Sequence, residues 1–288
     1  MTILITGASG AVGTPAIRHL VKRGAKIRAL TSKEGSAANL KSLGVAETVI
    51  GDLTSDADIN RAMAGVDTVF HIPPRFREDE AQIGMRVLKA AKAEKVGYFV
   101  FCSVFHPQMR DLDHHANKLL VEEAVVDSGL PFAIVQPASF MQNLRVEWPA
   151  IKERGVYLRA YSAQQKMALI DTEDLGEAAA KIITDPQYRG GTFELCGPDR
   201  LTNDEMAAII TEAWGKPIRA GKQSLDDWKT WAQGRGWKPW SIEAYVKMCR
   251  HYDAHGYAGG NPVVLSAILG RAPGGYRAFV KRFLASNP

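Results

Sequence analysis

The sequence has few cysteines, no long apolar run and no block of charge of one sign. Cys102, Cys196 and Cys249 stand far apart along 288 residues, so they form neither a disulfide framework nor a zinc-binding group. No stretch reaches the roughly 18 apolar residues of a membrane span, and the first strand begins at once, without signal-peptide architecture. These absences predict a cytoplasmic protein in a reducing compartment, with no membrane association and no metal.

The charge is modestly positive and evenly spread. The formal net charge is +5 and the isoelectric point is about 9.0, yet no basic tail or unbroken basic run is present. A scattered surplus of this kind suits an anionic small ligand as well as nucleic acid. Because no DNA-reading motif accompanies the charge, we expect no nucleic-acid partner.

The first half of the chain alternates short apolar segments with helical ones. The apolar segments lack strict alternation, as expected of strands that are covered on both faces. Strand–helix alternation predicts a parallel sheet between helices, and six such strands indicate a doubly wound, Rossmann-type α/β fold. The predicted strands are 3–6, 26–30, 47–50, 68–72, 98–102 and 132–136, and the predicted helices are 14–23, 36–43, 56–63, 79–94 and 115–127.

The pattern changes after about residue 140. Helices are predicted over 172–184 and 203–214, with a late strand over 192–195 between them. From Leu225 onward the sequence is helical and rich in tryptophan, and periodic aromatics of this kind favour a packed core. We predict a nucleotide-binding domain over 1–140, with its core returning at about 165–200, and a smaller, mainly helical substrate or cap region over 141–288.

A glycine-rich turn joins the first predicted strand to the first predicted helix. Gly7 permits a sharp turn, Gly10 lets the backbone approach a pyrophosphate, and Gly13 lets the helix pack close to the sheet. Phosphates would then lie on the positive end of the helix. The alternative is an ordinary strand-to-helix turn. The predicted pyrophosphate contacts are Gly7, Ser9, Gly10, Ala11, Val12 and Gly13.

The end of the second predicted strand bears on the choice of cofactor. An acidic residue there would bind the ribose 2′-hydroxyl and repel a 2′-phosphate, but the chain has Thr31, Ser32 and Lys33. Hydroxyls and a cation favour NADP(H) over NAD(H), with Glu34 falling one or two residues late. After the third strand, Asp52 beside Leu53 either accepts from the adenine amino group or forms a local cap.

Several motifs occur along the chain in an order that is typical of one family. They span nearly the whole chain, which resembles the NmrA-like branch of the atypical short-chain dehydrogenase/reductases. The resemblance implies an NAD(P)-binding protein of a family that mixes reductases with cofactor-sensing regulators. The motifs are Gly7 to Gly13, Gly51-Asp52-Leu53, Lys118-x-x-x-Glu122, Ser128 to Pro131, Gln136 to Asn143, Asp171-x-x-Asp174-Leu175-Gly176, Gly197-Pro198 and Leu269 to Pro273.

Two positions depart from the family pattern. Gln136 stands where the family usually has an arginine before the proline that ends the sixth strand. The superfamily's Tyr-x-x-x-Lys is absent, since His114 stands four residues before Lys118. The usual proton donor is therefore missing, and with it the basis for standard alcohol–ketone chemistry.

The resemblance nevertheless indicates candidate catalytic residues. Lys118 would hold the nicotinamide ribose, or it is a solvated helix lysine. His114 would replace the missing tyrosine as a proton donor, or it is a surface residue beside His115. Ser103 would bond substrate or nicotinamide at the end of the fifth strand, or it caps that strand. The resemblance also places His71 (through its backbone), Ile72, Pro73, Lys118, Pro137 and Phe140 beside the cofactor.

Aromatic side chains indicate the class of substrate. Phe140, Met141 and Asn143 follow the sixth strand and are expected to line the substrate pocket with Phe76 and Phe105. A flat, apolar, aromatic small molecule fits such walls. The first hypothesis is an NADPH-dependent oxidoreductase that transfers hydride to a conjugated electrophile such as a quinone or a dye. The alternative is a non-catalytic NADP(H)-sensing regulator with a protein partner. The oligomeric state is not predicted by the sequence, and a homodimer is one of the alternatives.

Overall fold

The computed structural model describes residues 1–287 and divides the chain into two compact units. Unit 1 consists of Met1–Pro137, Thr172–Leu195 and Ala267–Gly270. Unit 2 consists of Ala138–Asp171, Cys196–Ser266 and the chain from Arg271 onward. None of the helices within residues 1–287 is long and apolar enough to cross a membrane.

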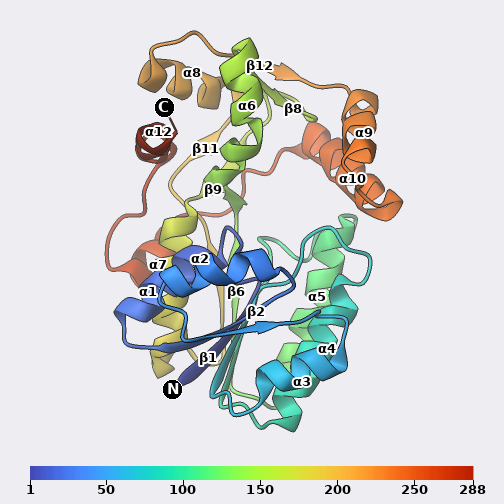
Figure 1. Cartoon of the computed structure of the whole chain (residues 1–288). Helices are drawn as coiled ribbons and strands as arrows, with labels where there is room; N and C mark the ends of the chain where they lie inside the picture. Colours follow the sequence, from blue (N-terminus) through green and yellow to red (C-terminus); the bar gives the residue numbers. More distant parts are fainter. Residues whose placement is uncertain (288) are drawn as a thin grey trace. The chain divides into compact units, whose positions relative to one another are not determined.

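A seven-stranded parallel sheet forms the centre of unit 1, with helices on both faces (Figure 1). Its strand order is β10-β6-β5-β4-β1-β2-β3, which confirms the predicted Rossmann-type fold. The strands remain parallel, but the order in which successive strands are added to the sheet reverses between β1 and β4. This makes a switch point at the carboxyl edge, where ligands bind in such sheets. The strands are β1 (Thr2–Thr6), β2 (Lys26–Thr31), β3 (Glu47–Ile50), β4 (Thr68–His71), β5 (Tyr98–Cys102), β6 (Phe132–Pro137) and β10 (Gly191–Leu195).

Two groups of helices cover this sheet. α1 packs against α7 on one face, and α3, α4 and α5 pack side by side on the other (Figure 1). A 3₁₀ turn over Glu34–Ser36 precedes α2, so that helix begins later than predicted, whereas α5 begins two residues earlier and includes both histidines. The helices are α1 (Gly13–Lys22), α2 (Ala37–Ser42), α3 (Asp56–Met63), α4 (Glu80–Ala93), α5 (Asp113–Val126) and α7 (Thr172–Thr184).

Small residues set the helix spacing in unit 1. A Cβ on Gly84 of α4 would lie 2.6 Å from a methyl group of Val121 on α5, and a Cβ on Gly176 of α7 would lie 2.7 Å from Pro15 on α1. Both distances are shorter than van der Waals contact, so these helix pairs approach through glycine. The apolar centre between sheet and helices includes the fully buried Val69 and Phe99.

Unit 2 combines helices with two small sheets. One sheet has the order β11-β9-β7 and the other pairs β12 with β8. These strands were not predictable from the sequence, because two to four residues are too few to show a period of two. The elements are β7 (Ser139–Phe140), α6 (Leu144–Arg154), β8 (Val156–Arg159), β9 (Met167–Ile170), β11 (Arg200–Leu201), α8 (Asn203–Trp214), β12 (Arg219–Lys222), α9 (Leu225–Gly234), α10 (Pro239–His255) and α12 (Tyr276–Ser286), with α11 (Val263–Leu269) crossing between units.

The tryptophan-rich segment forms a packed aromatic cluster. Trp228 of α9 is buried and stacks on Tyr245 of α10, with ring centroids 3.9 Å apart and an interplanar angle of 12°. Trp237 meets Trp228 edge-on at 5.4 Å. Trp228 thus confirms the prediction that these aromatics build a core. All three cysteines are buried thiols as well.

Candidate functional site

The glycine turn between β1 and α1 leaves no room for larger residues. Gly7 has φ +62°, and a Cβ there would lie 2.8 Å from the carbonyl oxygen of Ile72. A Cβ on Gly13 would lie 2.5 Å from the carbonyl oxygens of both Gly7 and Ala8. These neighbours are backbone atoms, which cannot rotate aside, so a side chain at either position would displace the turn.

The turn carries the chain directly into α1. The Gly10 N–H donates to the Gly7 carbonyl at 3.0 Å, and the Thr14 N–H donates to the Gly10 carbonyl at 3.1 Å. The first turn of α1 contains no acidic residue. An anion can therefore approach the positive end of this helix without repulsion from a neighbouring carboxylate.

A cavity of about 230 Å³ lies at the carboxyl ends of β1 to β4 in unit 1. It brings together parts of the glycine turn, the ends of β2 and β3, and the segment after β4. Nine predicted cofactor contacts line it: Gly7, Ser9, Thr31, Ser32, Lys33, Asp52, Leu53, Ile72 and Pro73. Gly10, Ala11, Val12, Gly13, His71 and Lys118 lie in the same unit but are not part of this lining.

Arg77 also lines this cavity, although nothing in the sequence predicted it as a site residue. Its guanidinium donates to both carboxylate oxygens of Asp79, at 2.7 and 2.6 Å. The hydrogen bonds to Asp79 raise the pKa of Arg77, so the cavity lining has a second basic side chain besides Lys33. Arg77 belongs to no motif and follows a loop after Pro73-Pro74, so no spacing in the sequence indicated it.

The side chain of Asp52 is committed to its own turn. One carboxylate oxygen accepts from the backbone N–H of Thr54 at 2.8 Å and from its hydroxyl at 2.9 Å. The local-cap interpretation of Asp52 therefore describes the structure, although Asp52 also lines the cavity.

His71 anchors the end of β4 to the end of β1. Its Nδ1 lies 2.8 Å from the hydroxyl of Thr6, which also accepts from the Ile72 N–H at 3.0 Å. The imidazole is fully buried, and burial, followed by the positive charge of Lys118, lowers its pKa to about 3. The ring is therefore neutral at physiological pH and acts as a fixed brace behind Ile72.

Lys118 lies in the interior and not in solvent, so the solvated-lysine alternative is wrong. Its side chain is 9% exposed and forms an ion pair with Glu80, whose side chain is 1% exposed. Burial raises the pKa of Glu80, while the charge of Lys118 and its hydrogen bond act in the opposite direction. A buried pair of this kind fixes α4 and α5 against each other and restricts the lysine to one orientation.

His114 is likewise buried in α5, so the surface alternative for this histidine is wrong. Burial, then the charges of His115 and Lys118, lowers its pKa well below the ordinary value of 6.5. Its Nδ1 has no hydrogen-bond partner among residues 1–287. The ring packs 4.7 Å from that of Phe76, a residue held at φ +53°. His114 is therefore a neutral, buried imidazole packed against Phe76 in unit 1.

Ser103 at the end of β5 belongs to a buried polar cluster. The side-chain amide of Gln136 donates to both oxygens of Glu122 at 2.9 Å. Burial raises the pKa of Glu122, and hydrogen bonds from Ser103 and Gln136 lower it. Gln136, which replaces the family's arginine, thus partners this carboxyl group without adding a charge.

The predicted substrate residues fall into both units. In unit 1, Phe105 is fully buried and Phe76 is half-buried against His114. In unit 2, Phe140 and Met141 line a small internal cavity, and Asn143 follows in the next turn. Pro137 ends β6 in unit 1. The burial of Phe105 makes it a wall residue and not a surface for direct substrate contact.

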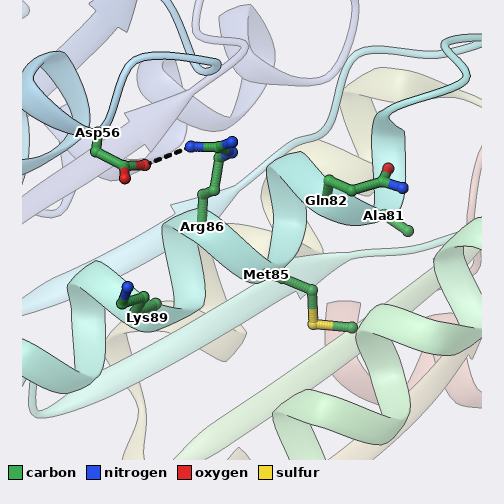
Figure 2. A pocket seen from close by; sticks show the side chains of 6 residues that line it. All are labelled: Asp56, Ala81, Gln82, Met85, Arg86 and Lys89. Atoms are coloured by element: carbon green, nitrogen blue, oxygen red, sulfur yellow. Dashed lines mark hydrogen bonds and ion pairs between the residues drawn. The ribbon is translucent and has the colours of Figure 1, made fainter.

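A larger but shallow hollow of about 530 Å³ lies along α4, away from the glycine turn. Arg86 donates to the carboxylate of Asp56 at 2.7 Å, and Figure 2 shows these two side chains pointing toward each other. Its lining has no convergent polar groups beyond this exposed ion pair. No group of three metal-ligating side chains occurs within the described residues either. The glycine-turn cavity is therefore the better candidate site.

Comparison with known proteins places the chain in a family. It is 29% identical over 273 residues to an NAD(P)H azoreductase from Xenophilus azovorans, covering 94% of this chain and 91% of that protein. It is 31% identical over 232 residues to a (4-alkanoyl-5-oxo-2,5-dihydrofuran-3-yl)methyl phosphate reductase from Streptomyces griseus, covering 79% of each.

An NADPH-dependent quinone oxidoreductase from Escherichia coli, crystallised with NADPH, has the same fold. The TM-score is 0.83 at 23% identity, over 98% of this chain and 99% of that one. The model of the NmrA-like family matches residues 1–254. The chain therefore belongs to the NmrA-like family.

Proposed function

We propose that this protein is an NADP(H)-dependent reductase of small conjugated or aromatic electrophiles. The observation that carries the proposal is the cavity at the carboxyl edge of unit 1, where the glycine turn, the end of β2 and the segment after β4 converge. The relatives named as reductases act on acceptors of different types, an azo compound and a furanone phosphate. What these share is a conjugated system that can accept a hydride.

The lining of the cavity fits a dinucleotide with a 2′-phosphate. Gly7 and Gly13 give a pyrophosphate access to the start of α1, since a side chain at either position would collide with backbone. Ser32, Lys33 and Arg77 supply a hydroxyl and two basic side chains to the lining of the cavity. A dianionic phosphate is favoured by such a set, because charge-assisted hydrogen bonds are stronger than neutral ones.

The roles of the buried residues follow from their charges. Lys118 would hold the ribose hydroxyls of the bound cofactor, whose reduced nicotinamide supplies the hydride. The ion pair with Glu80 holds the buried side chain of Lys118 in one orientation. His114 is neutral, so it would offer one N–H to substrate oxygen and would not act as a strong acid. An acceptor that delocalises its new negative charge tolerates this weak proton donor.

The test is a panel of acceptors supplied with NADPH. We expect oxidation of NADPH, followed by its absorbance, with quinones and azo compounds, and slower oxidation of NADH at equal concentration. The Lys33→Ala/Arg77→Ala variant should lose the preference for NADPH without losing activity with NADH. If none of the acceptors in the panel is reduced, the reductase proposal is contradicted. Equal affinity of the unmodified protein for NAD and NADP would contradict the cofactor preference.

A second candidate is a sensor that reports the redox state of NADP(H) to a protein partner. The observation that favours it is the replacement of the superfamily's tyrosine by a buried His114 whose pKa is lowered well below 6.5. A sensor would bind its partner with different affinity in the presence of NADP⁺ and of NADPH. Copurification from cells followed by titration with each form of the cofactor distinguishes the two functions.

A further inference from the structure

Phe76, in the segment between β4 and α4, has a backbone conformation that bulky residues rarely adopt. Its φ is +53°, in the left-handed region where the Cβ crowds the following carbonyl oxygen. The next residue is fixed by two hydrogen bonds, since the Arg77 carbonyl accepts from the Glu80 N–H at 3.3 Å and from the side-chain amide of Asn117 at 3.5 Å. Strained conformations persist where their surroundings fix them, and they cluster at functional sites.

The ring of Phe76 packs on a buried histidine of α5. Its centroid lies 4.7 Å from that of the His114 ring, at an interplanar angle of 39°. Pro74 and Arg77, close to Phe76 in the chain, belong to the lining of the glycine-turn cavity, but Phe76 does not. The same short segment therefore supplies part of the cavity wall and, through Phe76, a contact with α5. Both contacts lie within unit 1.

No hydrogen bond within residues 1–287 holds Nδ1 of His114, although this histidine is buried. A functional histidine is ordinarily oriented by a hydrogen bond to the ring nitrogen that the reaction does not use. Here aromatic contacts take that place, because Phe76 packs on the imidazole and His115 meets it edge-on, 4.4 Å away at 82°. His115 is itself fixed, with its Nδ1 2.9 Å from the carbonyl oxygen of His106. The orientation of His114 therefore depends on ring packing.

His114 lies one helical turn before Lys118 on α5. Side chains four residues apart share one face of a helix, and both of these side chains are buried. The ion pair with Glu80 fixes Lys118. His114 has no such charged partner, so the two candidate site residues of α5 are held in different ways. An ion pair holds the lysine, and ring contacts with Phe76 and His115 hold the histidine.

From these contacts we infer that Phe76 is a positioning residue, whose ring holds the imidazole of His114 in the orientation that its proposed hydrogen bond to the substrate requires. The inference rests on the proposed reductase function, in which His114 offers that N–H. Phe76 then acts through His114 and needs no contact with the substrate. Glycine would adopt the same φ without strain, so a phenylalanine at this position points to a need for the ring.

Phe76→Gly tests the inference, because it removes the ring and relieves the backbone. We expect kcat with a naphthoquinone to fall about tenfold, a part of the about 100-fold that a positioned acid–base group contributes. The Kd for NADPH should stay within about twofold, whereas a merely structural role would weaken it in parallel with kcat. Phe76→Tyr keeps the ring and should retain kcat. The matched control is Lys95→Gly, which relieves another residue of unit 1 at φ +53° and should leave kcat unchanged.

An NMR titration of the histidine ring protons, with His114→Gln identifying the resonance, needs no turnover. Burial, then the charges of His115 and Lys118, holds the pKa of His114 well below 6.5. In Phe76→Gly water reaches the imidazole, so this pKa should rise toward 6.5, and in Phe76→Tyr it should stay low.

The two measurements separate failure of the positioning role from failure of the reductase proposal. If the unmodified protein reduces no acceptor, the reductase proposal is overturned, and the NMR titration still decides whether the Phe76 ring fixes the surroundings of His114. An unchanged titration of His114 in Phe76→Gly, or parallel losses of kcat and of NADPH affinity, would overturn the positioning role.

Discussion

The edge of the sheet in unit 1 and the interior of unit 2 build their cavities in opposite ways. In unit 1 the cavity is shaped by main chain: Gly7 and Gly13 lie against carbonyl oxygens of their neighbours. In unit 2 the Arg159–Tyr276 cavity, a void of about 10 Å³ lined by these two residues among others, is built from side chains that lie between residues 139 and 276 in the sequence. A main-chain site depends on local geometry, whereas a side-chain site depends on how distant segments pack.

This difference predicts how the two sites respond to substitution. A change in the glycine turn acts on every contact at once, because the backbone itself moves. A change in the Arg159–Tyr276 cavity removes one side chain and leaves the others in place.

The largest effect is expected from Gly13→Ala. The new Cβ would lie 2.5 Å from two carbonyl oxygens, so α1 or the turn must shift. We expect the Kd for NADPH to rise about 100-fold, because moving binding groups by about 1 Å can cost this much in a site that depends on exact positioning. Fluorescence titration measures this. Gly97→Ala is the control, because its Cβ would make only ordinary contact at 3.4 Å. Unchanged affinity of Gly13→Ala for NADPH would contradict the assignment of cofactor binding to the glycine turn.

Breaking the buried ion pair comes next. Lys118→Met leaves Glu80 buried without its cation, which should lower the free energy of unfolding by about 3–5 kcal/mol. Without Lys118 the pKa of Glu80 rises further above its ordinary 4.5. Its protonation then favours the folded state, so the destabilisation caused by Glu80 should be smallest below pH 4.5 and grow as pH rises. Chemical denaturation across this range provides the measurement.

The double variant Glu80→Gln/Lys118→Met is the matched control for that experiment. It removes both charges and should recover most of the lost stability and lose the pH dependence. A double variant as unstable as Lys118→Met would show that the pair contributes through packing and not through charge.

The buried histidine predicts a third effect, which is absent at neutral pH and develops only in acid. The pKa of His71 falls from 6.5 to about 3 on folding, so the unfolded chain binds the extra proton within this range. Stability from this group is complete above pH 6.5 and is lost as pH falls toward 3, at about 1.4 kcal/mol per pH unit. Denaturation curves of His71→Gln should have a correspondingly smaller slope. An unchanged slope would assign the acid sensitivity to other groups, His114 first among them.

The smallest effect is expected at a helix cap in unit 2. The Thr202 hydroxyl accepts from the Glu205 N–H at 3.1 Å, and Glu205 accepts in return from the Thr202 N–H at 2.7 Å. Thr202→Ala should cost about 1 kcal/mol of stability and leave the Kd for NADPH unchanged. Ser224→Ala, the cap of α9, serves as the comparison. A weaker affinity for NADPH in either variant would contradict the proposal that NADPH binding depends on residues of unit 1.

The contrast also explains what the sequence could predict. The strand over 47–50 and the helices over 56–63 and 172–184 have the predicted bounds, because their polarity changes sharply at caps and turns. Most of the cavity lining in unit 1 followed from the glycine spacing and its position after a strand. Both are local signals, carried by a few neighbouring residues.

Signals that depend on distant neighbours were lost. The sequence could not distinguish a solvated Lys118 from a buried one, since the deciding partner, Glu80, lies 38 residues away. Arg77 was missed because only the folded loop turns it toward the glycine turn. The short strands β7, β8 and β9 have no readable period, so the cavity that they enclose had no signal at all.

The order of segments in unit 1 has a consequence for synthesis on the ribosome. α1, which follows the glycine turn, packs against α7 through Gly176 and Pro15. α7 and β10 emerge only after the intervening stretch Ala138–Asp171, which belongs to the other unit. The glycine turn and α1 are therefore synthesised well before α7, and one face of α1 stays uncovered until more than half of the chain has been made. Protection of that face during translation falls to the ribosome, to chaperones or to early cofactor binding.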